Sequence, residues 1–495
     1  LFRSDIGRAA RCGWHDQADR AIGVSTIGLR ECRTSHAGRQ HKQDELDHRV
    51  SPRTVERHCI IHKLNLCAIA RAHLWESRFQ VKLQPLTSWR GIRWSGFSRF
   101  HNRGFHMSIK GKAYIAGAFE HPLRKAPNHS LSQLHAEIAK GTLEDAGLTK
   151  NDIDGFFVAG DAPGGNVWSL ANYMNLNRLK HIDSTDMGGT SYLLHVAHAA
   201  EAIAAGKCNV ALITLAGRPN SEGSSGTQVR DRGAGVPDSP FELPYSPVTV
   251  NLYAMCAMRH MYQYGTTSEQ LAWVKVAASH HAQHNPNAML RNVVTVEEVL
   301  NSPMISDPLH RLDCCVVSDG GGGVIVTRPE IAKSLKRPLV KITGVGESTK
   351  HQMAGNVDLT YSGAAWTGPR AFEMAGVKPS DIKYASIYDS FTITVVMQIE
   401  DLGFCKKGEG GKFVADGNLI SGVGKFPWNT DGGGLCNNHP ANRGGMTKII
   451  EAVRQLRGEA HPKVQVKNCD IALAHGTGGA LGTRHGSGTV IMERE

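Results

Sequence analysis

Two short sequence patterns occur twice in the same order, and this internal repeat is the feature that most constrains the fold. Residues 146–153, AGLTKNDI, are followed 229 positions later by residues 375–382, AGVKPSDI. Residues 207–212, KCNVAL, are followed 261 positions later by residues 468–473, NCDIAL. The glycine of the first pattern is typical of a helix end, and the apolar residues of the second predict a buried strand. The chain therefore contains two halves with a similar α/β order.

A pair of glycines precedes the repeated strand in each half, Gly188-Gly189 in the first and Gly444-Gly445 in the second. Both pairs stand at the start of a predicted helix. The predicted strands over 154–159 (DGFFVA) and 211–216 (ALITLA) are almost continuously apolar. Strands of this kind are typical of sheets that helices cover on both faces. We therefore predict an α/β fold in which each half has its own layers.

We place the two halves at residues 107–335 and 336–495, with a long insertion in the first half over 218–310. Residues 1–106 differ from both, because they hold 19 Lys and Arg against 9 Asp and Glu. They also lack a sustained apolar period over most of their length. The sequence pI of about 9.1 therefore belongs to this segment and gives no evidence that the main body binds nucleic acid. We interpret 1–106 as a basic leader that is disordered or not native, with the true start at Met107.

The sequence excludes several other classes of protein. No apolar run reaches the roughly 18–20 residues that a membrane-spanning helix needs. The seven cysteines after Met107 include no CxxC pair and no metal-ligand spacing, which favours a reducing, cytoplasmic location. His280, His281 and His284 have helical spacing, but no carboxylate or cysteine completes a zinc site. We predict no metal, no bound cofactor, no membrane span and no nucleic-acid partner.

Four short motifs carry a family resemblance through their order and spacing: DMGGTS at 186–191, YDSF at 388–391, NHP at 438–440 and HGTGG at 475–479. Together they resemble the thiolase superfamily, most closely its sterol-carrier-protein-X and lipid-transfer-protein branch. The resemblance covers essentially all of the chain after Met107. It implies a duplicated thiolase fold, a five-layer α/β/α/β/α sandwich. It also implies that the insertion over 218–310 is the loop domain that covers the acyl-CoA.

The resemblance also identifies what this chain lacks. The nucleophilic cysteine of a thiolase lies at a buried helix N-terminus, where the helix dipole and free N–H groups favour the thiolate. The matching residue here is Gly189, and the second catalytic cysteine is matched by Gly476. Ser191 is an alternative nucleophile, although a local hydrogen-bonding role at the helix start fits it better. We expect Gly189, Ser191, Gly478 and Gly479 to line the substrate site.

Three further residues are candidate catalytic groups under the resemblance. His439 matches the Gly-His-Pro histidine, whose implied role is to donate into the oxyanion hole. Tyr388 matches the Asn of Asn-Glu-Ala-Phe, where the lipid-transfer-protein aldolases have Tyr; the alternative is a packed aromatic residue at a strand end. His475 matches a region in which the sterol-carrier-protein-X group supplies a histidine; the alternative is a buried histidine bonded to the backbone. Cys436 lies close to His439, but the family does not place its nucleophile there.

A thiolase scaffold without its cysteines favours a reaction that needs no acyl-enzyme. We therefore predict an enzyme that acts on a coenzyme A thioester and breaks the adjacent C–C bond by retro-aldol cleavage of a β-hydroxyacyl-CoA, with a sterol or other lipid side chain. The first alternative is an acetyl-CoA acyltransferase with an unassigned nucleophile. The second is a non-catalytic subunit of a thiolase complex. The resemblance implies a homodimer and a small OB-fold, zinc-ribbon partner protein.

Overall fold

One mixed sheet carries the repeat that the sequence predicts. The computed structural model describes residues 108–160, 162, 167–224, 241, 243–245, 248–351, 357–440, 444–482 and 485–495. Our interpretation of residues 1–106 as a leader therefore lies outside the described residues. The nine strands run in the order β3-β2-β4-β7-β1-β8-β11-β10-β9. They are β1 (Tyr114–Glu120), β2 (Gly155–Phe157), β3 (His181–Asp183), β4 (Val210–Gly217), β7 (Gly320–Thr327), β8 (Val340–Lys350), β9 (Tyr384–Ile387), β10 (Ile471–Gly479) and β11 (His485–Arg494).

The strand order of the first half recurs in the second. The series β2-β4-β7-β1 corresponds to β9-β10-β11-β8, and in each series the first pair is parallel while the next two pairs are antiparallel. The two series join through the pairing of β1 with β8 at Tyr114–Lys341 and Ile115–Val340. The duplication that the repeated sequence patterns predict is therefore confirmed.

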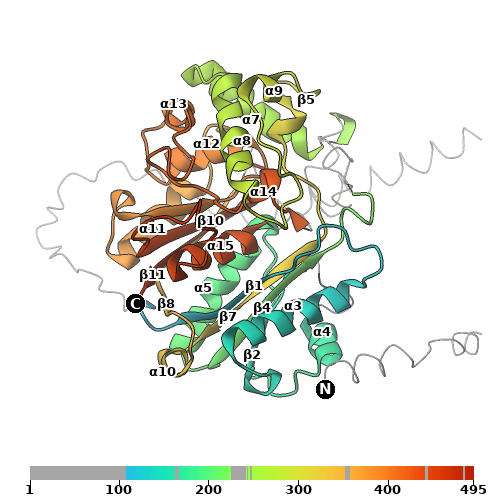
Figure 1. Ribbon diagram of the computed structural model, residues 1–495, viewed down its shortest axis with the longest axis vertical. Helices are drawn as coiled ribbons and strands as arrows, with labels where there is room; N and C mark the ends of the chain where they lie inside the picture. Colours follow the sequence, from blue (N-terminus) through green and yellow to red (C-terminus); the bar gives the residue numbers. More distant parts are fainter. Residues whose placement is uncertain are drawn as a thin grey trace, which may run out of the picture. The chain divides into compact units, whose positions relative to one another are not determined.

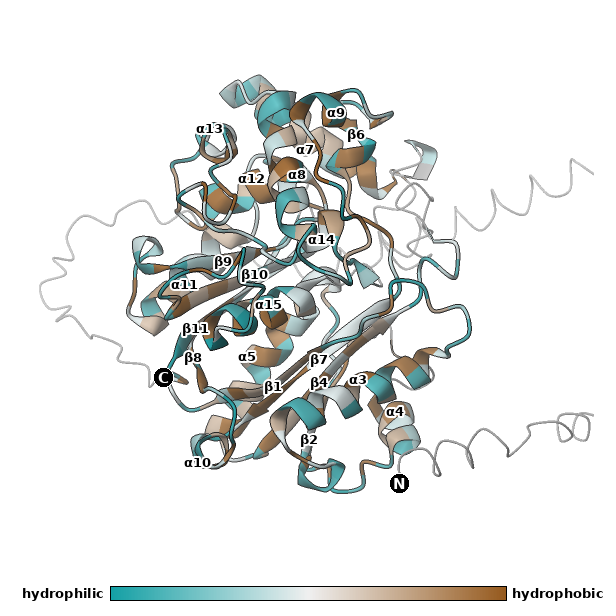
Figure 2. Ribbon diagram, viewed as in Figure 1, coloured by the Kyte–Doolittle hydropathy of each residue, from teal (hydrophilic) through white to brown (hydrophobic). Residues whose placement is uncertain are grey.

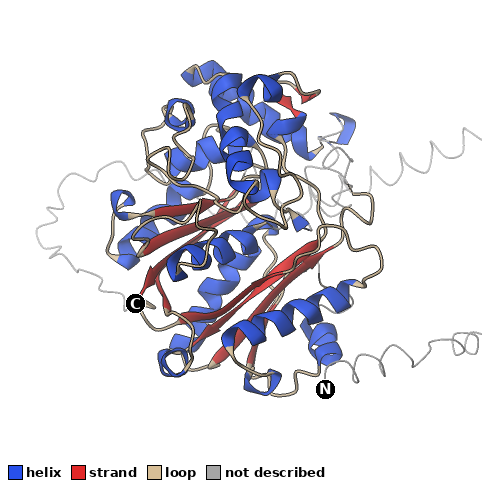
Figure 3. Ribbon diagram, viewed as in Figure 1, coloured by secondary structure: helices blue, strands red, loops and turns tan. Residues whose placement is uncertain are grey.

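The helices alternate with the two parts of the sheet (Figures 1 and 3). They are α3 (Leu131–Ala146), α4 (Val167–Met174), α5 (Ser191–Ala204), α7 (Thr249–Tyr264), α8 (Ser268–Ala282), α9 (Val296–Leu300), α10 (Pro329–Ser334), α11 (Ala364–Ala375), α12 (Thr392–Asp401), α13 (Gly410–Val414), α14 (Gly433–Cys436) and α15 (Gly445–Arg457). A short hairpin, β5 (Met304–Ser306) and β6 (Leu309–His310), lies outside the main sheet. None of the helices in the described ranges is long and apolar enough to cross a membrane.

Three hydrophobic clusters show that the layers number five. Residues of α3 and α4 pack on one face of the first part of the sheet. The central helices α5 and α15 share a cluster with strands of both parts, including Val324 of β7 and Val490 of β11. Residues of α11 and α12 cover the outer face of the second part. Hydrophobic residues follow the strands, and α3 alternates between hydrophilic and hydrophobic faces (Figure 2). The predicted five-layer α/β/α/β/α sandwich of the thiolase fold is confirmed.

Glycine ends the equivalent helices α3 and α11 in the same conformation. Gly147 and Gly376 both have φ of 72°, the left-handed region that L residues with side chains adopt at a cost. In both halves the amide of the next residue returns to a helix carbonyl, at Leu143 and at Phe372. The repeated sequence pattern therefore encodes the same exit from helix to strand twice.

The described part of the insertion between β4 and β7 leaves the first half and packs on the second. Its helices α7 and α8 share a hydrophobic cluster with α12, through residues such as Ala257, Val274 and Val396. In Figure 1 these helices lie over the end of the molecule that carries α12 and α14. Because of this crossing, a side chain of α7 reaches a strand of the second half: Tyr253 contacts Gly479 of β10.

The burial of neutral histidines gives a pH-dependent stability. Six of the described histidines have pKa values lowered to about 3 or 4, chiefly by burial: His135, His195, His281, His439, His475 and His485. Their unfolded forms bind protons near pH 6.5, so between pH 6.5 and about 4 the unfolded chain binds more protons than the folded one. The stabilisation is thus fully present above pH 6.5 and is lost as the pH falls.

We expect the free energy of unfolding to drop between pH 6.5 and 5, with a slope for each such histidine that rises toward, and stays below, about 1.4 kcal/mol per pH unit. Burial raises the pKa of Glu451 to about 7, so in this pH range the folded chain binds one more proton at Glu451 than the unfolded chain does. This single group offsets the contribution of one histidine. Denaturant titrations at several pH values measure the slope. A His135→Asn variant should lower the slope by about one proton, whereas a pH-independent stability would contradict the burial of neutral imidazoles.

Candidate active site

A tyrosine and a histidine form the centre of the candidate site. Tyr388 directly follows β9, and its Oη lies 2.8 Å from Nε2 of His439. The two rings meet edge to face, with their centroids 5.6 Å apart. The amide of Gly444, just before α15, donates to the same phenolic oxygen at 3.2 Å. Two of the residues that the sequence predicts for catalysis are therefore in direct contact, and both are buried.

The phenol occupies the space in which a side chain at position 189 would lie. A Cβ built on Gly189 would overlap the Tyr388 hydroxyl and the Thr477 carbonyl oxygen, and would lie 2.5 Å from Tyr388 Cζ. A Cβ at Gly476 would lie 2.5 Å from Cδ1 of Leu193. Position 189 is therefore closed by a backbone oxygen and a phenol, whereas a larger residue at position 476 would require the end of the Leu193 side chain to move. At the position that matches the thiolase nucleophile, the space is filled by the hydroxyl of Tyr388, which follows β9.

The remaining predicted glycines bring two backbones together. A Cβ on Gly478 would overlap the Met187 carbonyl oxygen and lie 2.5 Å from the amide nitrogen of Gly189. A Cβ on Gly188 would lie 3.1 Å from the amide nitrogen of Gly479. The strand β10 and the turn before α5 can approach this closely because neither carries side chains there.

Ser191 is engaged locally. Its hydroxyl donates to the Gly188 carbonyl oxygen at 2.7 Å and accepts from the Met187 amide at 2.9 Å. These bonds close the turn that holds Gly188 and Gly189 at the start of α5. The contacts support the interpretation of Ser191 as a helix-start hydroxyl rather than a nucleophile.

The backbone of His475 contacts Tyr388, whose amide donates to the His475 carbonyl oxygen at 3.0 Å, but the His475 side chain points away from the Tyr388–His439 pair. It lies within β10, and successive side chains of a strand point to opposite faces. Its neighbour Ala474 packs in the central cluster with α5 and α15, so His475 faces the outer layer. There its Nδ1 lies 2.8 Å from the hydroxyl of Thr489, which in turn contacts Thr367 of α11. Burial lowers the pKa of His475 to about 3.

Three residues of the site were missed by the sequence reasoning. Tyr253 of α7 is buried and donates to the Gly479 carbonyl oxygen at 3.3 Å, so the insertion supplies the side of the site next to β10. Asp389 and Lys448 form an ion pair of 2.8 Å beside Tyr388. Asp389 stands next to Tyr388 in a recognised motif, which was an available signal. Tyr253 and Lys448 lie in helices without a motif.

The electrostatics keep the central pair neutral. Burial lowers the pKa of His439 to about 4; the carboxylate of Asp389 opposes this shift and the ammonium of Lys448 reinforces it. Burial also raises the pKa of Tyr388 well above its ordinary value. At neutral pH the site therefore holds an uncharged imidazole next to an uncharged phenol. Transfer of a proton from the phenol to the imidazole alone would create a buried phenolate and imidazolium, which both pKa shifts oppose. The pair can therefore act as a relay only when a substrate hydroxyl gives its proton to the phenol in the same step.

His280, His281 and His284, for which the sequence analysis rejects a zinc site, are not part of the Tyr388–His439 pair. His281 is buried and accepts from the Ser421 amide at 2.9 Å, while His284 stacks on His461 with ring centroids 4.9 Å apart. The three histidines therefore do not converge on one point. Within the described ranges no group of three or more His, Cys, Asp or Glu side chains is arranged to hold a metal ion.

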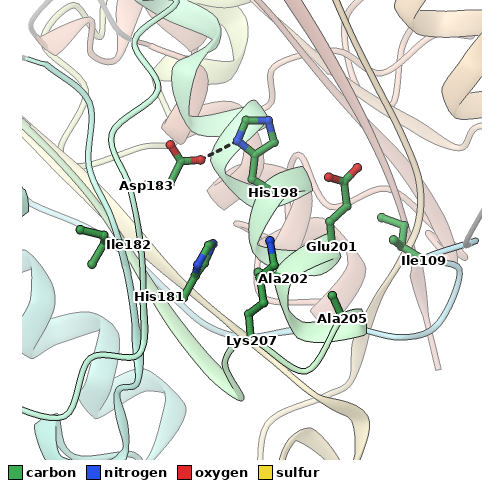
Figure 4. A pocket seen from close by; sticks show the side chains of 9 residues that line it. All are labelled: Ile109, His181, Ile182, Asp183, His198, Glu201, Ala202, Ala205 and Lys207. Carbon is green, nitrogen blue, oxygen red and sulfur yellow. Dashed lines mark hydrogen bonds and ion pairs between the residues drawn. The ribbon is translucent and has the colours of Figure 1, made fainter.

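A cavity of about 430 Å³ lies beside the C-terminal half of α5, away from Tyr388 and His439. Figure 4 shows His198 of α5 next to Asp183 of β3 at its rim. Nδ1 of His198 lies 2.6 Å from Asp183, and Nε2 lies 2.9 Å from Glu347 of β8, which raises the pKa of His198 to about 10. The cavity is lined by Ile109, His181, Ile182, Asp183, His198, Glu201, Ala202, Ala205 and Lys207.

The chain also matches known proteins in sequence and in fold. Residues 346–494 match the family "Thiolase C-terminal domain-like". A steroid side-chain-cleaving aldolase of Thermomonospora curvata is 36% identical over 363 residues, covering 71% of this chain and 91% of the relative. An acetyl-CoA acetyltransferase of Methanothermobacter thermautotrophicus is 34% identical over 369 residues, covering 72% and 93%. The solved Ltp2-ChsH2(DUF35) aldolase is 32% identical with a TM-score of 0.70, covering 78% of this chain and 98% of that one.

The duplicated sandwich, with its site at the start of two central helices, defines a thiolase-type enzyme. The chain belongs to the thiolase superfamily, in its sterol-carrier-protein-X and lipid-transfer-protein-like branch. The family resemblance that the sequence motifs indicate is thereby confirmed.

The packing of the phenol against Gly189 predicts a strong coupling between these two positions. Gly189→Ala should destabilise the fold by about 1–3 kcal/mol, because the added methyl overpacks a site that has no free space. Combining it with Tyr388→Asn removes the ring and should recover part of that loss. Denaturant unfolding of both single variants and the double variant measures the coupling. Purely additive losses would contradict the overlap between the two side chains.

Proposed function

We propose that this enzyme cleaves a β-hydroxyacyl-CoA by a retro-aldol reaction, with a sterol or another bulky lipid group on the β-carbon. The observation that carries the proposal is the Tyr388 phenol in the space of the thiolase nucleophile, in contact with neutral His439. Gly189, at the position that matches the thiolase nucleophile, has no side chain on which an acyl-enzyme could form, whereas a retro-aldol cleavage requires only proton transfer and enolate stabilisation. The identity of 36% to a steroid side-chain-cleaving aldolase supports the same reaction class.

The cleavage follows from the order of the contacts. The β-hydroxyl of the substrate gives its proton to Tyr388 Oη while the phenol passes its own proton to Nε2 of His439. The bond between the α- and β-carbons then breaks, its electron pair forms the thioester enolate, and the β-carbon leaves as a ketone or aldehyde. The enolate takes the proton back at its α-carbon, which yields the shortened acyl-CoA and restores the neutral pair.

The starts of the central helices supply the stabilisation of the enolate. The first N–H groups of a helix have no partner within it, and they lie at the positive end of the helix dipole. Here α5 and α15 begin close together, since a Cβ on Gly445 would overlap the Gly189 carbonyl oxygen. Donors that are already oriented at a developing oxyanion are typically worth about 100- to 1,000-fold in rate. His439 therefore acts as the proton acceptor in this reaction, not as the oxyanion donor that the resemblance implies.

An acetyl-CoA acyltransferase is the second candidate, favoured by the 34% identity to the acetyl-CoA acetyltransferase. It requires a nucleophile, and Ser191 and the buried Cys436 are the residues nearest in sequence to the two motifs. Intact-protein mass after incubation with acetyl-CoA and β-ketoacyl-CoAs separates the candidates. A covalent acyl adduct would favour the acyltransferase, whereas turnover of a β-hydroxyacyl-CoA without an adduct would favour the aldolase.

The assembly and location that we propose follow the same family. We propose a homodimer that works with a small OB-fold, zinc-ribbon partner, and the complex named for the solved Ltp2-ChsH2(DUF35) aldolase supports a two-protein assembly. We also propose a reducing, cytoplasmic setting. All seven cysteines in the described part of the chain are free, which is consistent with that setting.

We expect Tyr388→Phe and His439→Ala each to lower kcat/KM by about 100- to 1,000-fold, because each removes one end of the proton transfer. The assay is the release of ketone or aldehyde and acyl-CoA from a steroid β-hydroxyacyl-CoA, followed by mass spectrometry. His475→Gln should change the rate only a few-fold, since its side chain faces α11. A severe loss in His475→Gln together with normal rates in His439→Ala would reverse the assignment.

The neutral state of His439 predicts the pH profile. Because its pKa is lowered to about 4, kcat/KM should be flat from pH 6 to 8 and fall only as the pH approaches 4. Circular dichroism at each pH separates this limb from unfolding. An acid limb near pH 6.5 in folded enzyme would mean that His439 is solvated and that the relay as written is wrong.

A further inference from the structure

A buried ion pair joins the three elements that carry the candidate catalytic residues. Asp389 and Lys448 are each 1% exposed, and Oδ1 of Asp389 lies 2.8 Å from Nζ of Lys448. The same carboxylate accepts two backbone amides of α14, from Gly434 to Oδ1 at 2.9 Å and from Leu435 to Oδ2 at 3.1 Å. The two amide contacts are hydrogen bonds to a carboxylate, whereas Lys448 Nζ meets Asp389 at ion-pair distance without the geometry of a hydrogen bond.

Each partner of this network is one step from a catalytic group. Asp389 is covalently next to Tyr388. Lys448 lies in the first turn of α15, whose preceding residue Gly444 donates to the Tyr388 hydroxyl. A Cβ on Gly434 would lie 3.1 Å from Oδ1 of Asp389 and 3.3 Å from Cδ2 of His439. The ion pair therefore connects the end of β9, the helix α14 that precedes His439, and the start of α15.

We propose that the Asp389–Lys448 ion pair is the positioning element of this site: it fixes Tyr388 and His439 relative to each other and presents them with no net charge. The positioning role rests on the proposed function, whereas the charge balance does not. A buried ion pair adds little stability compared with apolar residues, but removal of one partner leaves an uncompensated charge. A pair that contributes specificity rather than stability fits a site where a proton must move between two neutral groups.

The balance acts on His439 from two sides. The carboxylate of Asp389 raises the pKa of His439, and the ammonium of Lys448 lowers it. Other titratable groups surround this region. Cys315 and Tyr253 both raise the pKa of Tyr388, and Lys448 lowers that of Asp431. Lys275 of α8 donates to the Leu435 carbonyl oxygen at 2.7 Å. Asp389 and Lys448 are the charged groups that act on His439 directly, so their effects are expected to separate in single variants.

The test is the titration of His439 in the full chain without substrate, followed by NMR of labelled histidine and assigned with a His439→Gln variant. Asp389→Asn should move the pKa of His439 downward, and Lys448→Met should move it upward toward 6.5. The double variant should return it close to the wild-type value, because neither charge is then left. Shifts in the same direction in both single variants, or no shift in either, would overturn the proposal.

Activity gives the second readout. Each single variant should lose about 10- to 100-fold in kcat with a smaller change in KM, as expected when the geometry of reacting groups is disturbed. The acid limb of the pH profile should move in opposite directions in the two variants. Arg457→Met is the matched control. Arg457 is the last residue of α15, at the opposite end from Lys448, and it forms a 2.9 Å ion pair with Asp145 of α3. This variant should leave the titration of His439 unchanged.

The design remains informative if a single variant does not fold. The double variant Asp389→Asn/Lys448→Met removes both charges of the pair, while Asp431, which also interacts with Lys448, keeps hydrogen bonds from the Gly433 amide and the Asn437 side chain. The double variant should fold, with a pKa for His439 close to the wild-type value and a reduced kcat. A double variant with full activity would overturn the positioning role. Opposite shifts of the His439 pKa in the absence of any retro-aldol activity would retain the charge balance and instead reject the proposed reaction.

Discussion

The two central helices begin in contact with each other at Gly189 and Gly445, and the architecture of the site depends on this contact. No side chain fits between them, so the first turns of α5 and α15 face the same small volume. Each half of the duplicated chain contributes one of these helices and part of the sheet beneath it. The phenol of Tyr388 lies at the same place, where it receives the Gly444 amide and contacts Gly189. Glycine is therefore required here for close approach rather than for flexibility.

Exchange of a sulfur for a phenol changes what the helix starts can do. A thiolate at a helix N-terminus is stabilised as an anion and acts as a nucleophile. In this chain the hydroxyl comes from the opposite side, is buried, and has its pKa raised. In the proposed reaction, the positive ends of the helices would stabilise a transient oxyanion on the substrate. The scaffold thus retains stabilisation of negative charge while it gives up covalent attachment.

The sequence was sufficient for the fold because the same local signals occur twice. The helix-ending glycines Gly147 and Gly376 and the apolar strands that follow set the element order, and the observed strand series repeats accordingly. Tyr388 and His439 were accessible for the same reason, since each lies in a short contiguous motif. Lys448 and Tyr253 were not, because their roles arise from contacts with residues far away in sequence. The direction of His475 could not be predicted either, because alternation along β10 does not tell which face carries the site.

The site has a further property that follows from the duplication. Gly188-Gly189 and Gly444-Gly445 are equivalent positions of the two halves, yet they meet at one place. The candidate site therefore lies where equivalent backbones of the two halves meet, and the repeat of the fold does not produce a repeat of the site. A chemical difference between the two sides must come from residues that have no counterpart in the other half. Tyr388 is one such residue, and Tyr253, which the insertion brings to the second half, is another. They make the two sides of the site chemically different.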